Sequence, residues 1–469
     1  MCIFKGHLFR IEDLENSHKH LSGLQIFKYT NIQFLPNDHD NKLNCMIKLS
    51  PVPRQSFLIE TEGTNSSGNL GIAENFIYRS KNLIKGAELF EFAINGGLEA
   101  QNTFGGTKSE TIEPLDVFNT IEIGTSVKIN FPKLMFPIKE EMIPKRYNPR
   151  TAVSAAYNYQ QRTDYIRTIA NLSFGYEWKE GKPKTHILYP IDLSSVKLDK
   201  NSLILDTINF ISNDFIRNSF TDQLITAIRY SFIYSDQKLN KKANFNYFRG
   251  NLEIAGNMLR TASKLSNAVI DSIDNSYKIF GIKYAQYSKV DVDWRNYLFI
   301  NQHSTLVFRI ASGLGLPFGN STVMPFERSF FAGGSNGIRA WQARQLGPGS
   351  YTGPSNYDQI GDIKIEGNIE SRYEFIGVLE GAAFIDAGNI WLTHEDPERP
   401  GALFSGNEFL NEIAIGAGLG IRLNYNYFII RLDASLPIKD PSQPKGARWI
   451  IGDSSFDIIN YNLGIGYPF

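Results

Sequence analysis

Residues 412–425 alternate between two kinds of side chain at every step: Glu412-Ile413-Ala414-Ile415-Gly416-Ala417-Gly418-Leu419-Gly420-Ile421-Arg422-Leu423-Asn424-Tyr425. All odd positions are apolar, whereas the even positions are small, polar or charged. A period of two indicates a β-strand with one face in an apolar medium and the other in a polar one. The stretch therefore predicts a strand at the boundary between two environments.

The same alternation recurs from residue 53 to the end of the chain, in about sixteen segments. Many have ~10 residues or more, the length of a transmembrane β-strand, and an even number is typical of single-chain outer-membrane barrels. The segments lie near 55–63, 69–79, 88–101, 117–131, 150–161, 165–178, 184–194, 222–235, 243–259, 276–290, 297–315, 361–374, 379–391, 411–425, 427–436 and 456–469. The predicted fold class is an all-β membrane protein, with a 16-stranded antiparallel transmembrane β-barrel over residues 53–469.

Short and long connections alternate between these segments. Residues 179–183 and 375–378 are short, whereas 105–116, 196–222, 317–360, 392–410 and 437–455 are long. This alternation is expected of periplasmic turns and external loops, with residues 131–150 an exception on the short side. A soluble β-sandwich fits poorly, because its packed sheets need shorter strands and one dry interior.

The composition is compatible with a membrane barrel and excludes other classes. The chain carries 48 basic and 48 acidic residues, so it has no general attraction for nucleic acid. The sequence contains no run of eighteen apolar residues, so no transmembrane helix is predicted. A mean hydropathy of −0.24 suits strands that expose only alternate residues to lipid. Cys2 and Cys45 form no metal-binding motif, and we expect no metal site and no cofactor.

The long connection at residues 317–360 is glycine-rich. It contains Pro325-Phe326-Glu327-Arg328-Ser329-Phe330-Phe331-Ala332-Gly333-Gly334-Ser335-Asn336-Gly337-Ile338-Arg339-Ala340-Trp341. Its apolar side chains need a surface to bury against, which indicates an ordered segment. Gly333, Gly334 and Gly337 allow positive φ, so a tight hairpin can present Arg339 at its tip. We expect this loop to fold into the barrel.

Residues 1–52 have a different pattern. A short helix is predicted over residues 11–21, followed by strands at 26–34 and 43–49 that form a hairpin. The unit is too small to bury a core alone, and it reads as the second half of a small α/β module. Its start contains no signal-peptide core, so we expect an exported protein to begin earlier.

The loop, placed between the eleventh and twelfth predicted strands, resembles a family motif. Phe331 to Trp341 is similar to F-x-G-G-x-x-x-(V/I)-R-G-(F/Y) of the outer-membrane assembly-barrel superfamily that includes BamA, TamA and the two-partner secretion transporters. The chain departs from it at Ala340, where the family usually has Gly, and at Trp341. Residues 1–52 resemble the C-terminal part of a periplasmic POTRA domain. Among the members of this superfamily, the resemblance favours the TamA-like lipoprotein form (TamL), which is the expected subtype.

The resemblance implies a partner for Arg339. Phe384-Ile385-Asp386-Ala387-Gly388 is similar to the family's F-x-D-x-G element, whose acid receives the loop arginine. The alternation places Asp386 and Glu370 on the polar face of neighbouring strands. We expect Arg339 to bind both carboxylates, an arrangement we call the loop lock. Other charges on polar faces, such as Arg309, Arg422 and Asp433, are expected only to line a wet interior.

The end of the chain resembles an outer-membrane targeting signal. The signal-like residues are Gly464, Gly466, Tyr467 and Phe469, and the alternation puts Tyr467 and Phe469 on the apolar face with Ile465. The two glycines and Pro468 weaken pairing between the last strand and the short, acidic first strand. We expect this seam to act as a lateral gate, although a terminal aromatic anchor is also a common feature of such barrels.

The leading functional prediction is an assembly or translocation factor that moves polypeptides into or across the bacterial outer membrane, without a nucleotide. Its expected partners are outer-membrane lipids, nascent outer-membrane or exported polypeptides and, from the resemblance, a periplasm-spanning TamB-like subunit. A passive porin or uptake channel is the alternative, and it predicts an open interior. A membrane hydrolase using His303 and Ser304 is disfavoured, because adjacent strand residues point to opposite faces.

Overall fold

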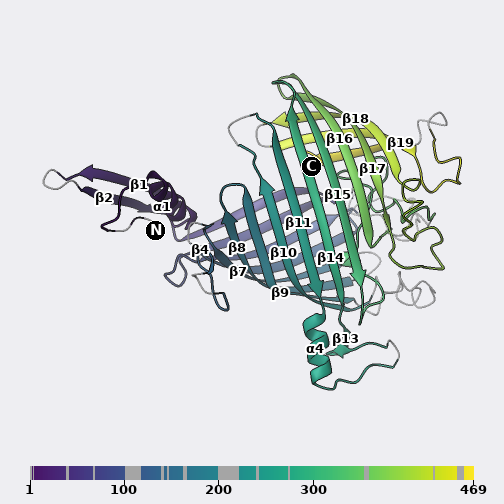
Figure 1. The fold of residues 1–469 in the computed structure, drawn as a ribbon, viewed down its shortest axis with the longest axis horizontal. Helices are drawn as coiled ribbons and strands as arrows, with labels where there is room; N and C mark the ends of the chain where they lie inside the picture. Colours follow the sequence, from purple (N-terminus) through teal and green to yellow (C-terminus); the bar gives the residue numbers. More distant parts are fainter. Residues whose placement is uncertain are drawn as a thin grey trace.

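A computed structural model describes residues 3, 5–37, 42–66, 69–100, 118–138, 142–144, 147–161, 166–198, 221–238, 242–272, 275–352, 359–425, 428–450 and 459–469. Sixteen strands form one antiparallel sheet in the order β20-β19-β18-β17-β16-β15-β14-β11-β10-β9-β8-β7-β6-β5-β4-β3. The sheet is strongly curled, so it has an inner and an outer face (Figure 1). The expectation of sixteen antiparallel strands is confirmed.

The strands of this sheet follow one another along the chain with few interruptions. They are β3 (Gln55–Ser66), β4 (Asn69–Lys81), β5 (Leu89–Glu99), β6 (Thr120–Phe131), β7 (Arg150–Gln161), β8 (Ile166–Glu180), β9 (Lys184–Leu198), β10 (Gln223–Ser235), β11 (Phe245–Ala255), β14 (Tyr287–Phe299), β15 (Ser304–Pro317), β16 (Ile363–Ile376), β17 (Leu379–Trp391), β18 (Ala414–Tyr425), β19 (Phe428–Lys439) and β20 (Asn460–Ile465).

Two strands lie elsewhere than predicted. The segments expected at 276–290 and 297–315 are β14 at 287–299 and β15 at 304–317. A tight turn separates them, in which Ile300 N donates to Ser304 O over 3.0 Å and the Asn301 side chain accepts from His303 N. The apolar run that ends at Ile300 conceals this turn in the sequence, because it continues the strand pattern without a glycine or proline.

The strand expected at 243–259 is also shorter, because β11 ends at Ala255. Gly256 has φ +79°, and a Cβ at this position would overlap the carbonyl oxygen of Ala285. The chain then forms helix α4 (Asn257–Leu265), which the sequence analysis did not predict, and a small hairpin of β12 (Lys278–Ile279) and β13 (Ile282–Lys283). Both project from one end of the sheet (Figure 1).

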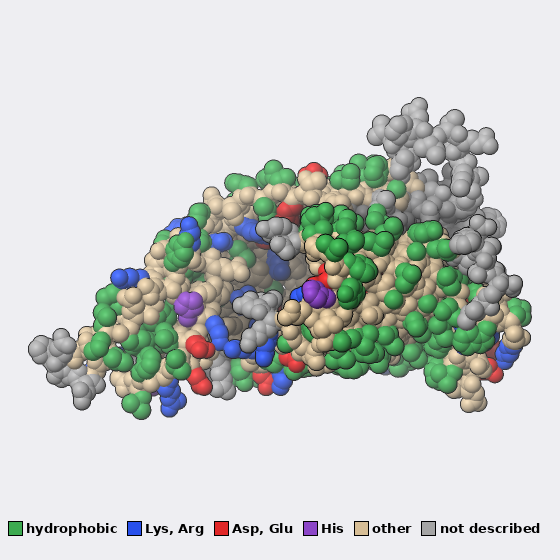
Figure 2. Space-filling view, turned by 90° about the horizontal axis from the view of Figure 1, so that it is seen from above, with side chains coloured by type: hydrophobic (Ala, Val, Ile, Leu, Met, Phe, Trp, Pro, Cys, Tyr) green, Lys and Arg blue, Asp and Glu red, His purple; other side chains and the backbone are tan. Residues whose placement is uncertain are grey.

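The two faces of the curled sheet carry opposite chemistry. Outward side chains are apolar and exposed, such as Leu419 (69%) and Ile421 (59%), whereas Arg422 on the other face is fully buried. Hydrophobic side chains cover much of the sheet's outer surface (Figure 2). An apolar exterior around a charged interior is the arrangement of a β-structure surrounded by lipid.

Residues near the N-terminus form the predicted helix and hairpin: α1 (Ile11–Gly23), β1 (Phe27–Pro36) and β2 (Leu43–Pro51). This unit contacts the sheet where β7 begins, since Arg150 Nη2 donates to Gly23 O over 3.0 Å. Strand β11 runs in the same direction as β7, because four antiparallel steps separate them in the sheet. Helix α4 follows the end of β11, so it lies at the rim opposite to the one where β7 begins and the N-terminal unit makes contact. Neither α1 nor α4, within the described residues, is long and apolar enough to cross a membrane.

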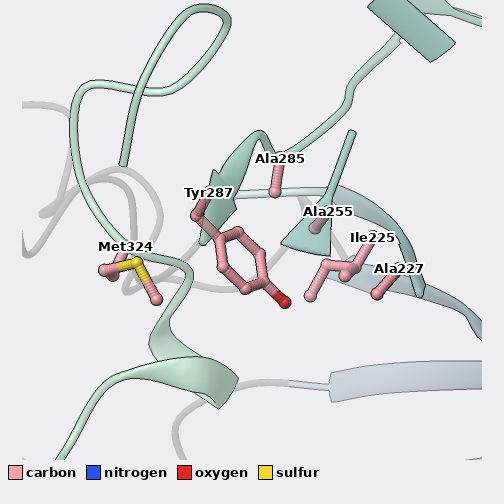
Figure 3. Close-up of a cluster of buried hydrophobic side chains, with 6 residues drawn as sticks. All are labelled: Ile225, Ala227, Ala255, Ala285, Tyr287 and Met324. Atoms are coloured by element: carbon pink, nitrogen blue, oxygen red, sulfur yellow. The ribbon is translucent and has the colours of Figure 1, made fainter. Parts of the chain in front are cut away.

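A small apolar core lies at the rim that carries α4. It consists of Ile225, Ala227, Ala255, Ala285, Tyr287 and Met324 (Figure 3). Met324 belongs to the loop between β15 and β16, so this core holds the start of the loop against β10, β11 and β14. The side-chain amide of Asn320 strengthens the contact by donating to the carbonyls of Tyr277 and Tyr284 at 3.0 and 2.8 Å.

The apolar outer face predicts that the folded chain depends on detergent. Removing detergent from the purified protein is expected to cause aggregation, because the exposed leucine and isoleucine side chains would meet water. Size-exclusion chromatography with light scattering, and gel mobility before and after heating, measure the result. Monodisperse protein without detergent would contradict the prediction.

Candidate functional site: the arginine at the tip of the inward loop

The glycine-rich loop folds back on itself as a tight hairpin. Gly334 N donates to Trp341 O over 2.9 Å, and Gly333 and Gly334 have φ of +89° and +90°. A Cβ at Gly333 would overlap the carbonyl of Gln342. Gly337 does not adopt positive φ; it provides space, because an added Cβ would lie 3.3 Å from Glu366 Oε2. The hairpin directs Arg339 into the interior.

Arg339 is fully buried and binds both expected carboxylates. Its Nε and Nη2 donate to the two oxygens of Asp386 at 2.8 and 2.9 Å, and Nη1 donates to Glu370 Oε2 at 2.6 Å. The backbone N of Arg339 also donates to Asp386, at 3.1 Å. The guanidinium lies over the ring of Phe384, 3.3 Å from its centroid. The structure thus brings Arg339, Glu370, Asp386 and Phe384 together.

Further charges surround this pair. Arg422 Nη1 and Arg372 Nε donate to Glu370 Oε1 at 2.6 and 2.7 Å. Asp433 lies 3.5 Å from Arg339 and 3.1 Å from Arg431. The expectation that Arg422 and Asp433 only line a wet interior is wrong, because both side chains are fully buried within the charge network.

Arg309 is likewise not a solvated wall charge. It forms an ion pair with Glu366 and lies 3.0 Å from Asp293. The alternation identified Arg309, Arg422 and Asp433 as inward-facing. It could not reveal their partners, because those lie on other strands and depend on how the sheet curls.

The backbone of the loop tip has its own partners, which the sequence analysis missed. Arg339 O accepts hydrogen bonds from Ser435 Oγ at 2.7 Å, Asn460 Nδ2 at 2.7 Å and Asn462 Nδ2 at 2.9 Å. Asn368 Nδ2 donates to Gly337 O at 3.0 Å. The one sequence feature that could have identified these residues is a polar side chain at an inward position of a strand. The last strand, β20, is therefore bonded directly to the loop tip.

The apolar residues of the motif fall into two places. Ile338 is fully buried in a cluster with Ala332, Leu346, Ile390 and Ala414, and Phe330 and Trp341 pack against it. A Cβ at Gly388 would approach Ile338 Cδ1 to 3.1 Å, so Gly388 leaves room for Ile338. Phe331 packs elsewhere, edge-to-face on Phe326 and beneath Arg344.

Ala340, where the motif departs from the family pattern, is matched by a glycine on the facing strand. A Cβ at Gly416 would overlap the Cβ of Ala340. The methyl group of Ala340 occupies the space that a side chain at Gly416 would take, so the hairpin can still contact β18 closely.

The end of the chain turns into the interior, which corrects the predicted apolar face. Strand β20 stops at Ile465, and Gly466 has φ +83°. Tyr467 then donates to Glu380 at 2.8 Å, and Arg372 Nη2 donates to Phe469 O at 3.2 Å. Only 7% of Phe469 is exposed, so Tyr467 and Phe469 do not share the outward face of Ile465. One residue with positive φ interrupts the alternation and sends the following side chains inward.

The two edge strands form the seam. Strand β20 pairs with β19 over only six residues, Asn460–Ile465, while β3 has twelve. Strands β3 and β20 come close to each other, but no hydrogen-bonded ladder joins them among the described residues. The seam is therefore the weakest lateral contact of the described sheet. Gly464 leaves room on β20 for the guanidinium of Arg431.

An outward apolar face, an inward loop and a buried charge network define a β-structured protein of the outer membrane. Residues 61–469 match the Omp85 superfamily domain, and the chain belongs to this superfamily. Family membership and the fold support a location in the outer membrane.

Solved structures have the same fold at low identity. BamA from Haemophilus ducreyi lacking POTRA domains 1-3 aligns with a TM-score of 0.61 and 12% identity, over 99% of this chain and 79% of that one. CdiB from Acinetobacter baumannii aligns with a TM-score of 0.52 and 10% identity, over 94% and 67%. CdiB from Escherichia coli aligns with a TM-score of 0.51 and 12% identity, over 93% and 68%.

A compensating pair tests how the loop fits its wall. Gly416→Ala is expected to push the hairpin off β18, at about 1–3 kcal/mol, because the new methyl overlaps that of Ala340. Ala340→Gly in the same chain should restore the fit. Hydrogen exchange of the loop amides measures both effects. Gly406→Ala is the control, since its Cβ enters open space; equal exchange in the two Gly→Ala variants would refute the fit.

A double-mutant cycle tests the ion pair itself. Arg339→Ala and Asp386→Asn should each speed exchange of the loop amides, and the double variant should be little worse than either, because both remove the same contact. Since the pair is buried, its coupling should exceed the ~0.2–1 kcal/mol of exposed ion pairs. Additive effects would show that the loop is held in another way.

Proposed function

We propose that this protein inserts polypeptides into the outer membrane or translocates them across it, through a lateral gate between β3 and β20 of a closed barrel. The observation that carries the proposal is the pinned loop. Arg339, which is fully buried and bound to Glu370 and Asp386, holds the hairpin inside the curled sheet. The loop lock of these three residues is proposed to keep the gate region in its working geometry.

A passive porin or uptake channel is the competing function. It needs an open interior, whereas a fixed hairpin inside the sheet obstructs one. The charges of the network are also bound to one another rather than free to attract a solute. These contacts favour the assembly or translocation factor over the porin.

The lateral gate is supported by the seam and by the hydrogen bonds of the last strand. Strand β20 is short, and the chain leaves it at Gly466. Asn460 and Asn462 of the same strand donate to Arg339 O, so movement of β20 and movement of the loop tip are connected. An incoming polypeptide that pairs with the free edge of β3 would separate the two edges.

The remaining assignments are part of the same proposal. Residues 1–52 would be the C-terminal part of a POTRA-like periplasmic domain, and residues 53–469 the barrel, with the loop at 317–360. We propose the TamA-like lipoprotein form, with outer-membrane lipids, nascent polypeptides and a TamB-like subunit as partners. No catalytic step is involved, and His303, which lies on an exposed turn 3.7 Å from Glu374, has no assigned role.

Depletion in the native bacterium tests the function. Loss of the protein is expected to lower the level of specific outer-membrane or surface proteins, and the wild-type chain should restore them. Arg339→Ala should reach the membrane but restore them poorly, because its strands form without the loop contact. An unchanged outer-membrane proteome, or steady high conductance of the purified wild-type protein, would favour a passive channel.

A crosslink tests the gate. Cysteines replacing Ile59 on β3 and Ile465 on β20, in a chain with Cys2 and Cys45 changed to serine, are expected to form a disulfide that blocks assembly activity. A pair replacing Leu432 and Leu463, which face each other on β19 and β20, is the control. That bridge joins strands that stay paired and should leave activity intact. Full activity with the seam bridged would exclude the gate.

A further inference from the structure

The inward loop has a second set of polar contacts, eleven residues before Arg339. Glu327 and Arg328 lie in a short 3-10 turn, Phe326–Arg328. Arg167 Nη1 donates to Glu327 Oε1 at 2.9 Å. Arg328 lies 3.4 Å from Glu253 and 3.7 Å from Asp192. These partners come from β8, β11 and β9, none of which contributes to the loop lock.

Neighbouring residues fix the carboxylates and the backbone at this place. Glu253 is buried and accepts a hydrogen bond from Tyr287 Oη at 2.5 Å. Lys289 Nζ donates to Arg328 O at 2.8 Å and lies 4.3 Å from the centroid of the Phe330 ring. A Cβ at Gly313 on β15 would overlap the same ring, so Phe330 lies directly on the wall. The contacts are therefore built into a packed surface.

The two sets of partners belong to different parts of the sheet. Glu370, Asp386 and Asp433 belong to β16, β17 and β19. Arg167, Asp192 and Glu253 belong to β8, β9 and β11. In the strand order β14 and β15 separate the two groups, so that β16 lies three places from β11 and β19 lies nine places from β8. Residues 328–339 therefore connect the part of the sheet formed by β8, β9 and β11 with the part formed by β16, β17 and β19.

We infer that Glu327 and Arg328, bound to Arg167, Asp192 and Glu253, form a second attachment site that positions the loop across the interior independently of Arg339. A loop released at Arg339 alone would remain tethered to β8, β9 and β11. A loop released at Glu327 and Arg328 alone would remain tethered at its tip. Loss of one attachment would open the interior to ions only slightly, and loss of both would open it fully, whichever polypeptides the protein handles.

Conductance in planar bilayers tests this inference with three variants of the full chain. Arg339→Gln alone and the pair Glu327→Gln with Arg328→Gln should each raise conductance slightly above that of the wild type. All three substitutions together should raise it by more than the sum of the two separate increases. If Arg339→Gln alone already gives the full increase, or if the added pair contributes nothing, the second attachment does not exist.

Arg249→Gln is the matched control. Arg249 lies on the same face of β11 as Glu253 and bonds to Asn251, so its loss should leave conductance unchanged in an Arg339→Gln background. An increase equal to that of the Glu327 and Arg328 pair would mean that any lost cation opens the interior, which overturns the inference.

A charge exchange covers the case in which the triple variant does not fold. Glu327→Arg should speed hydrogen exchange of residues 325–331, because two arginines would then face each other. Adding Arg167→Glu should restore protection by re-forming the pair with reversed charges. Heat-modifiable gel mobility checks that each variant is folded. Unchanged exchange in Glu327→Arg, or no recovery in the exchanged pair, would refute the contact.

Discussion

A guanidinium group buried away from water needs carboxylate partners, and the interior of this protein is organised around that requirement. Arg339 is fully buried, and transferring its charge out of water costs several kcal/mol unless the lost hydration is replaced. Asp386 replaces it with two parallel hydrogen bonds and Glu370 with a third. Asp386 accepts three hydrogen bonds from Arg339, two from the guanidinium and one from the backbone N, so the loop tip and the wall each depend on the other.

This mutual dependence extends to the strands. Glu370 also forms ion pairs with Arg372 and Arg422, and Asp433 forms one with Arg431. Guanidinium and carboxylate groups therefore alternate over β16 to β19. Removing one member of such a network leaves an unpaired buried charge, which costs more than the pair contributes. The network is therefore better understood as a device for specifying one loop position than as a source of stability.

The same network links the loop to the end of the chain. Arg372, which binds Glu370, also donates to Phe469 O, and its guanidinium lies 4.1 Å from the ring centroid of Tyr467. Asn460 and Asn462 connect β20 to the loop tip through Arg339 O. The weakest edge of the described sheet and the buried loop tip thus share partners, which gives a physical route by which one can respond to the other.

Residue types and spacing predicted the period-two strands, the face on which most of their side chains lie and the glycine hairpin, whereas the pairing of Arg339 with Glu370 and Asp386 was expected from the family resemblance. The strands, their faces and the hairpin depend on local geometry, which residue types and spacing record. The folded arrangement was needed to show that Arg422 and Asp433 join the network, that Asn460 and Asn462 bind the loop backbone, and that Tyr467 and Phe469 turn inward. Alternation assigns a face but not a neighbour, because neighbours on an inner face are set by the curl of the sheet and the path of the loop. The positive φ at Gly466 interrupts the alternation, so Tyr467 and Phe469 leave the outward face, and no periodic pattern records that change.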